Sequence, residues 1–429
     1  MNTLAPARDH AATSPADPSP SGLPTAARVA AVTVLTSLPV FLPGAANGLI
    51  SAEFGWSTAR MGAVLAAYWL ASLAGAFVSK RAALPPAVER TLAAALGATC
   101  LGLLCAAAVP AVGLWLSSAM GGFAYGFTQP HTNALLMRRC SARLRAFAFG
   151  LKQAAVPAAT LLASMAMPAL AGRAGWRAVF AGTAVLCGLS AVLMARTAAP
   201  GDRSGTARRV GGPALRGDVF LLALSGAGFF GAMVGNGLGG FLVLSLTSRG
   251  ASLPVAGVVA TAGAATNIAV RLIAGWLIGR VPRVAWVALT AMFATGAVGT
   301  ALLAQGSLAL AAVGALLAYG GGWGWAGLLH YVIGLPYPGR EQRATAYSQM
   351  GVSLGAATGP MACGLLFTVN PDAAWTALTA AGVAALVCAL LARGRNVRAR
   401  QGRPPAGVQP LTQKASTRTA LTEHPESAP

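Results

Sequence analysis

Twelve stretches of the sequence are apolar over about 20 residues, the length that an α-helix needs to cross the hydrocarbon core of a bilayer. They cover residues 29–50, 58–79, 91–109, 112–136, 146–170, 177–195, 218–246, 254–279, 284–304, 307–334, 344–368 and 375–392. The polar stretch 197–217, which holds Pro200, Asp202 and four arginines, separates six of them from the other six. This pattern predicts an all-α membrane protein with 12 transmembrane helices in two six-helix halves, residues 28–196 and 218–393.

Lysine and arginine are distributed unevenly between the segments that join these stretches. If both termini lie on one side, that side carries most of them, and the other side carries only Arg60, Arg173, Arg177 and Arg249. An excess of positive charge marks the cytoplasmic side of membrane proteins. We therefore expect a bacterial inner-membrane protein with both termini in the cytoplasm. On that side we place a disordered tail (1–27), the linker 197–217 and a basic tail (394–429).

The composition argues against several other classes of protein. Only 10% of the 429 residues are charged and 55% are hydrophobic, whereas soluble domains carry about 25% charged residues. The net charge of +21 comes from short basic clusters, not from the continuous basic face that nucleic acid requires. The six cysteines form no CxxC pair, and no Walker loop or Ser/His/Asp order appears. We expect no nucleic-acid partner, no metal, no cofactor and no enzymatic activity.

The two predicted halves resemble each other in sequence. "RAFAF" at 145–149 returns as "RATAY" at 343–347, and "AAT" at 158–160 returns at 356–358, with a spacing of 198 residues in both cases. Two parallel six-helix repeats are the architecture of a large class of transporters whose substrate site lies between the halves at the membrane midplane.

Several segments carry a resemblance to a known family. "EFGWS" (53–57), "FGLKQAAVPAATLLASMAMPAL" (149–170) followed by "GWRAVF", "RLIAGWLIGRVPR" (271–283) and "GGWGWAGL" (321–328) are similar to the major facilitator superfamily. The branch that they most resemble is the cyanate/nitroimidazole-permease-like group of bacterial transporters. The resemblance implies the superfamily fold, with pseudo-twofold symmetry between the halves, and transport by alternating access.

The sequence departs from the family pattern in its loop motif. Gly279 stands where the motif usually has an aspartate that helps to lock one conformation, and Ser79 stands at the matching place in the first half. Lys80 and Arg280 keep only the basic part of that lock, so we expect them to act in gating.

No aspartate or glutamate lies near the middle of the twelve stretches. The ten acids are Asp9, Asp17, Glu53, Glu89, Asp202, Asp218, Glu341, Asp372, Glu423 and Glu426, all in tails, loops or helix ends. The ionisable groups inside the stretches are basic or neutral: Lys152, Arg271, His131 and His330. Ionisable groups within a membrane are costly and usually functional.

Arg271 is the residue of this set that has least access to water at the interface. It lies nine residues from Arg280, or about 13 Å along a helix. Its charge can be matched by an anionic substrate, by backbone carbonyls or by water in a cavity. Asn267 lies one turn away on the same face. The resemblance implies a substrate contact for Arg271; the alternative is a structural arginine bonded to helix carbonyls.

Lys152, followed by Gln153, has two interpretations. Its side chain either lines the substrate path or extends back to the interface along its own stem. His131 and His330 occupy nearly equivalent places in the two halves, and each either relays a proton or is simply hydrogen-bonded.

Other residues are candidates through their setting in apolar helices. Trp325, with Trp323 nearby, either lines the cavity or packs as an ordinary ring. Asn47 and Asn236, each before a glycine, are predicted to face the path. Gly355, Gly359 and Pro360 are expected to let their helix approach a neighbour and flex during gating.

The sequence leaves three functions open. The first is a monomeric secondary transporter for a small organic anion. The second is an efflux pump for drugs or neutral metabolites. The absence of carboxylates within the membrane argues against proton-coupled export of cationic drugs. The third is a membrane receptor that has kept the fold, for which the linker and the tail are too short and polar to form an output domain.

Overall fold

The computed structural model describes residues 22–82, 88–197, 215, 217–305 and 307–401, and in these residues the regular structure is helical. The first half contains α1 (Gly22–Ala45), α2 (Asn47–Phe54), α3 (Thr58–Arg81), α4 (Val88–Ala108), α5 (Pro110–Arg139), α6 (Ala142–Ala166), η1 (Met167–Ala171) and α7 (Gly172–Arg196). The second half contains α8 (Val219–Ser248), α9 (Leu253–Arg280), η2 (Pro282–Val284), α10 (Ala285–Leu303), α11 (Leu308–Leu317), η3 (Ala318–Gly322), α12 (Ala326–Gly334), α13 (Glu341–Val369) and α14 (Pro371–Gln401).

The helices have the length and composition of membrane spans. Among the described residues, eleven helices are long and apolar enough to cross a bilayer. The sequence stretch at 112–136 forms α5, which has 30 residues but is less apolar because of the polar run 128–133. Large apolar side chains point outward over much of the surface, among them Leu222, Val258 and Leu365, which are each about 70% exposed. A soluble protein rarely exposes so much apolar surface, whereas lipid accommodates it.

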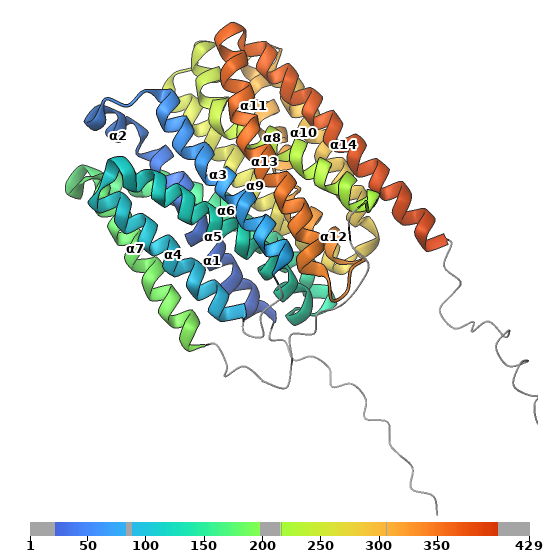
Figure 1. Ribbon diagram of the computed structural model, residues 1–429. Coiled ribbons are helices and arrows are strands. Elements are labelled where there is room, and N and C mark those ends of the chain that lie inside the picture. The colour runs from blue at the N-terminus through green and yellow to red at the C-terminus, as the bar shows by residue number, and fades with distance from the viewer. Residues whose placement is uncertain (1–21, 83–87, 198–214, 216, 306, 402–429) are drawn as a thin grey trace, which may run out of the picture.

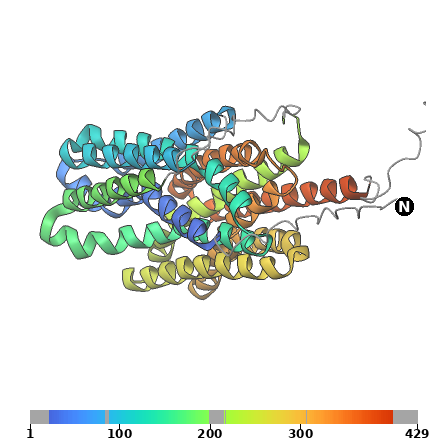
Figure 2. The same cartoon turned by 90° about the horizontal axis from the view of Figure 1, so that it is seen from below.

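The two halves form two helical bundles that lie side by side, the first coloured blue to green and the second yellow-green to red (Figure 1; Figure 2). Within the first half, α5 packs against α3 and α4, and α6 packs against α1. Within the second half, α8 packs against α13 and α14. The halves meet mainly where α6 contacts α9 and where α13 contacts α3.

The fourth membrane helix of the second half is interrupted. The chain there runs from α11 through the π-helical segment η3 and a turn at 323–325 before α12 begins. The cause is local: the sequence "GGGWGW" supplies glycines that weaken a regular helix. Because the backbone leaves the regular α-helical pattern, carbonyl groups become available to side chains of neighbouring helices.

Two predicted boundaries differ from the structure. The first helix begins at Gly22, so residues 22–27 are helical and not part of a disordered tail; Pro24 is compatible with this because a helix tolerates proline in its first turn. The last helix continues to Gln401, past the predicted start of the basic tail at 394. The linker 197–217 lies mostly outside the described residues, as do the rest of the two tails.

Candidate functional site

Lys152 lies deep between helices of the first half. Its side chain is 0% exposed, and its Nζ donates to the carbonyl of Gln129 at 3.0 Å and to Oδ1 of Asn133 at 2.5 Å. Gln129 and Asn133 are one turn apart on α5, so both present their oxygens to the same point of α6. The ammonium group therefore does not extend back to the interface, which excludes that interpretation of Lys152.

Arg271, on α9, binds backbone carbonyls on two other helices. One terminal nitrogen donates to the carbonyl of Gln153 in α6, across the boundary between the halves, and the other donates to the carbonyl of Trp323. Gln153 has a free carbonyl because its partner four residues later is Pro157, which has no N–H. Trp323 lies in the turn between η3 and α12. Both carbonyl groups can thus accept from Arg271 because the regular helical hydrogen bonding is interrupted at these two places.

Asn267 supports the same interruption from one turn away. Its Nδ2 donates to the carbonyl of Tyr319, within η3, at 2.6 Å, and its side chain is 0% exposed. Asn267 and Arg271 together hold both ends of the irregular segment against α9. Arg271 is 3% exposed, so it faces neither lipid nor an open surface.

Several polar atoms around these cations are buried without a hydrogen-bond partner. They are Asn133 Nδ2, Arg271 Nε, Asn267 Oδ1 and His330 Nε2. His330 Nδ1 is bonded to the carbonyl of its own helix at Ala326, 2.8 Å away. A carbonyl oxygen only accepts, so Nδ1 of His330 carries the proton and Nε2 of the neutral ring is an acceptor. The unpartnered donors of this group are therefore Asn133 Nδ2 and Arg271 Nε.

A small cavity adjoins the guanidinium. It is lined by α6, α9, α10 and the glycine-rich region before α12, including Gly150, Arg271, Ala274, Gly275 and Gly324. The ion pairs of the described residues join Arg139 to Glu89, Arg177 to Glu53 and Arg249 to Asp372, so none of them neutralises Lys152 or Arg271.

The halves are in close contact at the end of the bundle where Lys80, Arg139, Arg145, Arg280 and Arg340 lie, which we call the basic end. A further polar cluster closes this end. Gln342, at the start of α13, donates to the carbonyls of Ser79 and Ala82 at 2.8 and 3.2 Å. His131 lies beside it, 3.2 Å from the hydroxyl of Ser79 and 3.4 Å from the Gln342 amide. His131 thus belongs to the contact between halves, and His330 to the neighbourhood of the cations.

Lys80 also bridges the halves at this end, because its ammonium group lies 4.6 Å from the ring centre of Tyr347 on α13. Arg280 instead covers the ring of Trp276 on its own helix, at 3.7 Å.

Glycines allow α6 and α9 to approach backbone to backbone. A Cβ added to Gly275 would lie 2.7 Å from the carbonyl oxygen of Ala146, and one added to Gly279 would lie 2.2 Å from that of Arg143. Such distances exclude any side chain larger than hydrogen unless the helices move apart. Gly279, at the position where the resemblance would place an aspartate, therefore closes the basic end by steric fit.

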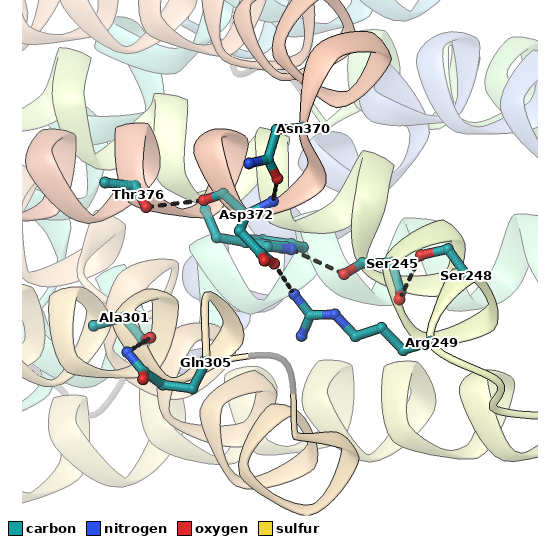
Figure 3. A network of polar contacts seen from close by, with 9 residues as sticks. Ser245, Ser248, Arg249, Ala301, Gln305, Asn370, Asp372 and Thr376 are labelled. Carbon is teal, nitrogen blue, oxygen red and sulfur yellow. Dashed lines mark hydrogen bonds and ion pairs between the residues drawn. The ribbon is translucent and has the colours of Figure 1, made fainter.

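At the opposite end, the polar contacts that we find hold each half together internally. Glu53 is paired with Arg177 and accepts a hydrogen bond at 2.8 Å from the indole of Trp176. This hydrogen bond, with the ion pair, lowers the pKa of Glu53. In the second half, Arg249 after α8 donates to Asp372 of α14 at 2.7 Å (Figure 3). The structure is thus sealed at the basic end.

The side-chain hydrogen bonds of the remaining predicted residues lie within their own half. Trp325 is 1% exposed, donates to the carbonyl of Gly322 at 2.8 Å and packs against Phe293, so it is part of the core of the second half and not of a cavity wall. Asn47 accepts from Ser51 within α2, and Asn236 donates to the carbonyl of Ala232 within α8.

Gly355 and Gly359 bring α13 against α8. A Cβ added to Gly355 would lie 2.0 Å from the carbonyl oxygen of Phe229, and one added to Gly359 would lie 2.5 Å from that of Met233. Pro360 follows within α13. The two glycines thus shape packing inside the second half.

The sequence reasoning missed the residues that hold Lys152. Gln129 and Asn133 are 1% and 0% exposed, and they belong to the run "TQPHTN" at 128–133. Five polar side chains within six residues of a membrane helix form a signal in themselves, and only His131 was singled out from this run. Gln342 was missed for a different reason, since it lies at a helix end where polar residues are ordinary.

Comparison with known proteins agrees with this architecture. The family model of the Major Facilitator Superfamily matches residues 29–234 and 224–424. The chain belongs to the major facilitator superfamily. It is a multi-pass membrane transporter, not an enzyme. No curated protein sequence matches the chain.

Solved structures of other superfamily members share the fold at low sequence identity. The human organic anion transporter MFSD10 is 16% identical with a TM-score of 0.68, and the match covers 86% of this chain and 100% of that one. The proton:xylose symporter XylE is 14% identical with a TM-score of 0.71, covering 88% and 96%. FucP in its outward conformation is 13% identical with a TM-score of 0.67, covering 87% and 99%.

Proposed function

We propose that this transporter carries a small organic anion through a central site formed by Lys152 and Arg271, by alternating access of its two halves. The observation that supports the proposal most is the charge of the site. Each half provides one buried cation, and no ion pair of the described residues includes Lys152 or Arg271.

The energetics of burial favour an anionic cargo. A charge removed from water costs several kcal/mol unless it is paired, and carbonyl oxygens compensate only part of that cost. An anion supplies the missing counter-charge, whereas a cationic cargo is repelled by both groups. The unpartnered donors Arg271 Nε and Asn133 Nδ2 add support, because a purely structural arginine gives no reason for a free donor on each side of the site.

The arrangement of contacts supports the transport cycle. The contacts of Lys80, His131 and Gln342 close the basic end, and the polar contacts at the opposite end lie within each half. If the basic end faces the cytoplasm of a bacterial cell, as the positive-inside rule favours, this is the outward-facing state of an inner-membrane transporter. Both termini are then cytoplasmic, and a single copy contains the whole site.

Uptake into proteoliposomes tests the proposal. The purified protein is reconstituted and supplied with radiolabelled small carboxylates, neutral solutes and cationic drugs. We expect uptake of carboxylates and a loss of at least about tenfold in Arg271→Ala and in Lys152→Ala, the effect of removing one charge-assisted hydrogen bond. Arg60→Ala is the matched control, because Arg60 is exposed at the opposite end and covers only Trp56. Unchanged carboxylate uptake in both central variants, or transport of cationic drugs alone, contradicts the proposal.

A further inference from the structure

We infer that the cargo is a short dianion of the dicarboxylate class, with one carboxylate held by Lys152 of the first half and the other by Arg271 of the second. The inference rests on the proposed function, which requires only that the cargo be an anion. It adds the number of charges that the cargo carries and the residue that meets each of them.

The first argument is a count of charges. Lys152 and Arg271 are 0% and 3% exposed, and neither has an acidic partner among the described residues. A monoanion between them neutralises one cation and leaves the other buried without a counter-charge. A dianion matches both, so the loaded site has no net charge to desolvate as the halves close around it.

The second argument is a count of hydrogen-bond donors on each side. Lys152 has three N–H donors and uses two of them, on Gln129 and Asn133. Beside it, Asn133 Nδ2 has no partner. The first half therefore offers two donors to one carboxylate, which accepts several hydrogen bonds on its two oxygens.

The second half offers a similar set. The guanidinium of Arg271 has five N–H donors, of which one on each terminal nitrogen is bonded to a carbonyl. Its Nε is unpartnered. A second carboxylate thus finds donors on this side as well.

The third argument concerns distance and size. Arg271 donates to the carbonyl of Gln153, the residue next to Lys152. The amide of Gln153 in turn lies 3.4 Å from Oε1 of Gln129, whose carbonyl accepts from Lys152. The two cations therefore share one small polar region, and the cavity that Arg271 lines is also small. A short dianion suits a small site, whereas a bulky anion does not.

A dianion also has a mechanical consequence that a monoanion lacks. Each half recognises one end of the cargo, so only a molecule with both ends engaged links α6 of the first half to α9 of the second. A matched monocarboxylate contacts one half and leaves the other without its counter-charge. Selection between the two classes follows from the same contacts that position the cargo.

Binding to the purified full-length protein tests the inference. Thermal stabilisation is measured with malonate, succinate and glutarate, and with the chain-matched monocarboxylates propionate, butyrate and valerate, at pH 7.5; binding to the folded state raises the midpoint. Radiolabelled counterflow in proteoliposomes gives the affinities. We expect the best dicarboxylate to bind at least about tenfold more tightly than its matched monocarboxylate, the effect of one charge-assisted contact.

Charge-neutral variants then identify the two contacts. Lys152→Gln and Arg271→Gln should each weaken the dicarboxylate by at least about tenfold more than the matched monocarboxylate, which removes the preference. Lys152→Arg retains the charge and should retain the preference, and Arg60→Gln is the control for loss of surface charge. A variant that does not fold is recognised because it shows no unfolding transition. In that case the dicarboxylate preference of Lys152→Arg is compared with that of the wild type, and we expect both to prefer the dicarboxylate.

The outcomes separate this inference from the proposed function. If dicarboxylates and monocarboxylates bind equally well to the wild-type protein, the dianion is wrong and an anion transporter remains. If the preference survives in Lys152→Gln, the assignment of one carboxylate to Lys152 is wrong. If no carboxylate binds, the proposed function fails together with the inference.

Discussion

Arg271 of α9 donates a hydrogen bond to the carbonyl of Gln153 in α6, and this bond crosses the boundary between the two halves. It exists because Pro157 leaves that carbonyl without its helical partner. The guanidinium that we propose for the cargo therefore also contributes to closure of the basic end. On our proposal, the same guanidinium contacts both the cargo and α6, so binding of the cargo is coupled to the contact between the halves.

Pro157→Ala should weaken this bond. Alanine restores an N–H that points to the carbonyl of Gln153, so α6 satisfies that oxygen itself and competes with Arg271. Hydrogen bonds to charged groups contribute about 1.5–3 kcal/mol, so a partial loss shifts the conformational population by about tenfold toward the state that is open at the basic end. Labelling of a single cysteine introduced at the basic end measures the shift.

Pro39→Ala is the matched control for Pro157→Ala. Pro39 also lies within a membrane helix, but it faces Gly121 inside the first half. The same chemical change there should leave labelling at the basic end as in the wild type. Equal labelling of the wild type and both variants means that the bond between Arg271 and Gln153 does not hold the halves together.

The membrane spans could be predicted from the sequence because an apolar run of sufficient length is a local feature that does not depend on tertiary contacts. The contacts of the central cations could not, because they join residues of different helices, which in the pair Arg271 and Gln153 are 118 positions apart. Asn267 was expected to share a face with Arg271, since spacing by four on a helix is local information. That both residues bind carbonyls of an interrupted helix depends on η3, which periodicity does not predict.

Lys152 shows the same limit. The sequence left two directions for its side chain, and only the position of α5 decides between them, through Gln129 and Asn133. Trp325 is a similar case: the sequence left it either lining the cavity or packing as an ordinary ring, and packing against Phe293 places it in the core.

Gly279→Ala should open the basic end by steric conflict. The added methyl group would lie 2.2 Å from the carbonyl oxygen of Arg143, which forces α9 away from α6. Overpacking of this kind costs about 1–3 kcal/mol, and the cost falls on the closed state alone. We expect increased cysteine labelling at the basic end and a lower thermal midpoint.

Gly257→Ala controls for the change in helix propensity on the same helix. A Cβ at Gly257 meets nothing within 4 Å, so alanine there should leave the conformation unchanged and slightly favour the helix. If Gly279→Ala behaves like Gly257→Ala, the close approach of α6 and α9 has no part in gating.

Asp218 should stabilise the start of the second half through two kinds of contact. Its Oδ1 accepts from the backbone N–H of Phe220 and Leu221 at 3.0 and 3.4 Å, and its Oδ2 accepts from the hydroxyl of Tyr337 at 2.5 Å. Burial, with the hydrogen bond to Asp218, raises the pKa of Tyr337, so the phenol stays protonated and donates at neutral pH.

Asp218→Ala should lower the free energy of unfolding by about 1–3 kcal/mol, the sum of a lost helix cap and a lost hydrogen bond to a carboxylate. Tyr337→Phe removes only the second contact and should cost about half as much. Unfolding midpoints of the two single variants and the double variant give the coupling between the residues. Additive effects in that cycle contradict a direct contact.

Acid should weaken the opposite end of the first half through Glu53. The hydrogen bond from Trp176 and the pairing with Arg177 lower the pKa of Glu53 below its ordinary value of 4.5. The folded protein therefore keeps this carboxylate ionised at a pH where the unfolded chain has already bound a proton. The stabilisation is complete above about pH 4.5 and is lost as the pH falls through the pKa of the folded state.

Glu53→Gln should unfold with less dependence on pH between 5 and 3 than the wild type, because glutamine does not titrate. Trp176→Phe should reduce the dependence more than Arg177→Gln, since the indole hydrogen bond is the largest cause of the lowered pKa. Unfolding midpoints measured across this pH range compare the four proteins, and parallel curves for wild type and Glu53→Gln contradict the assignment.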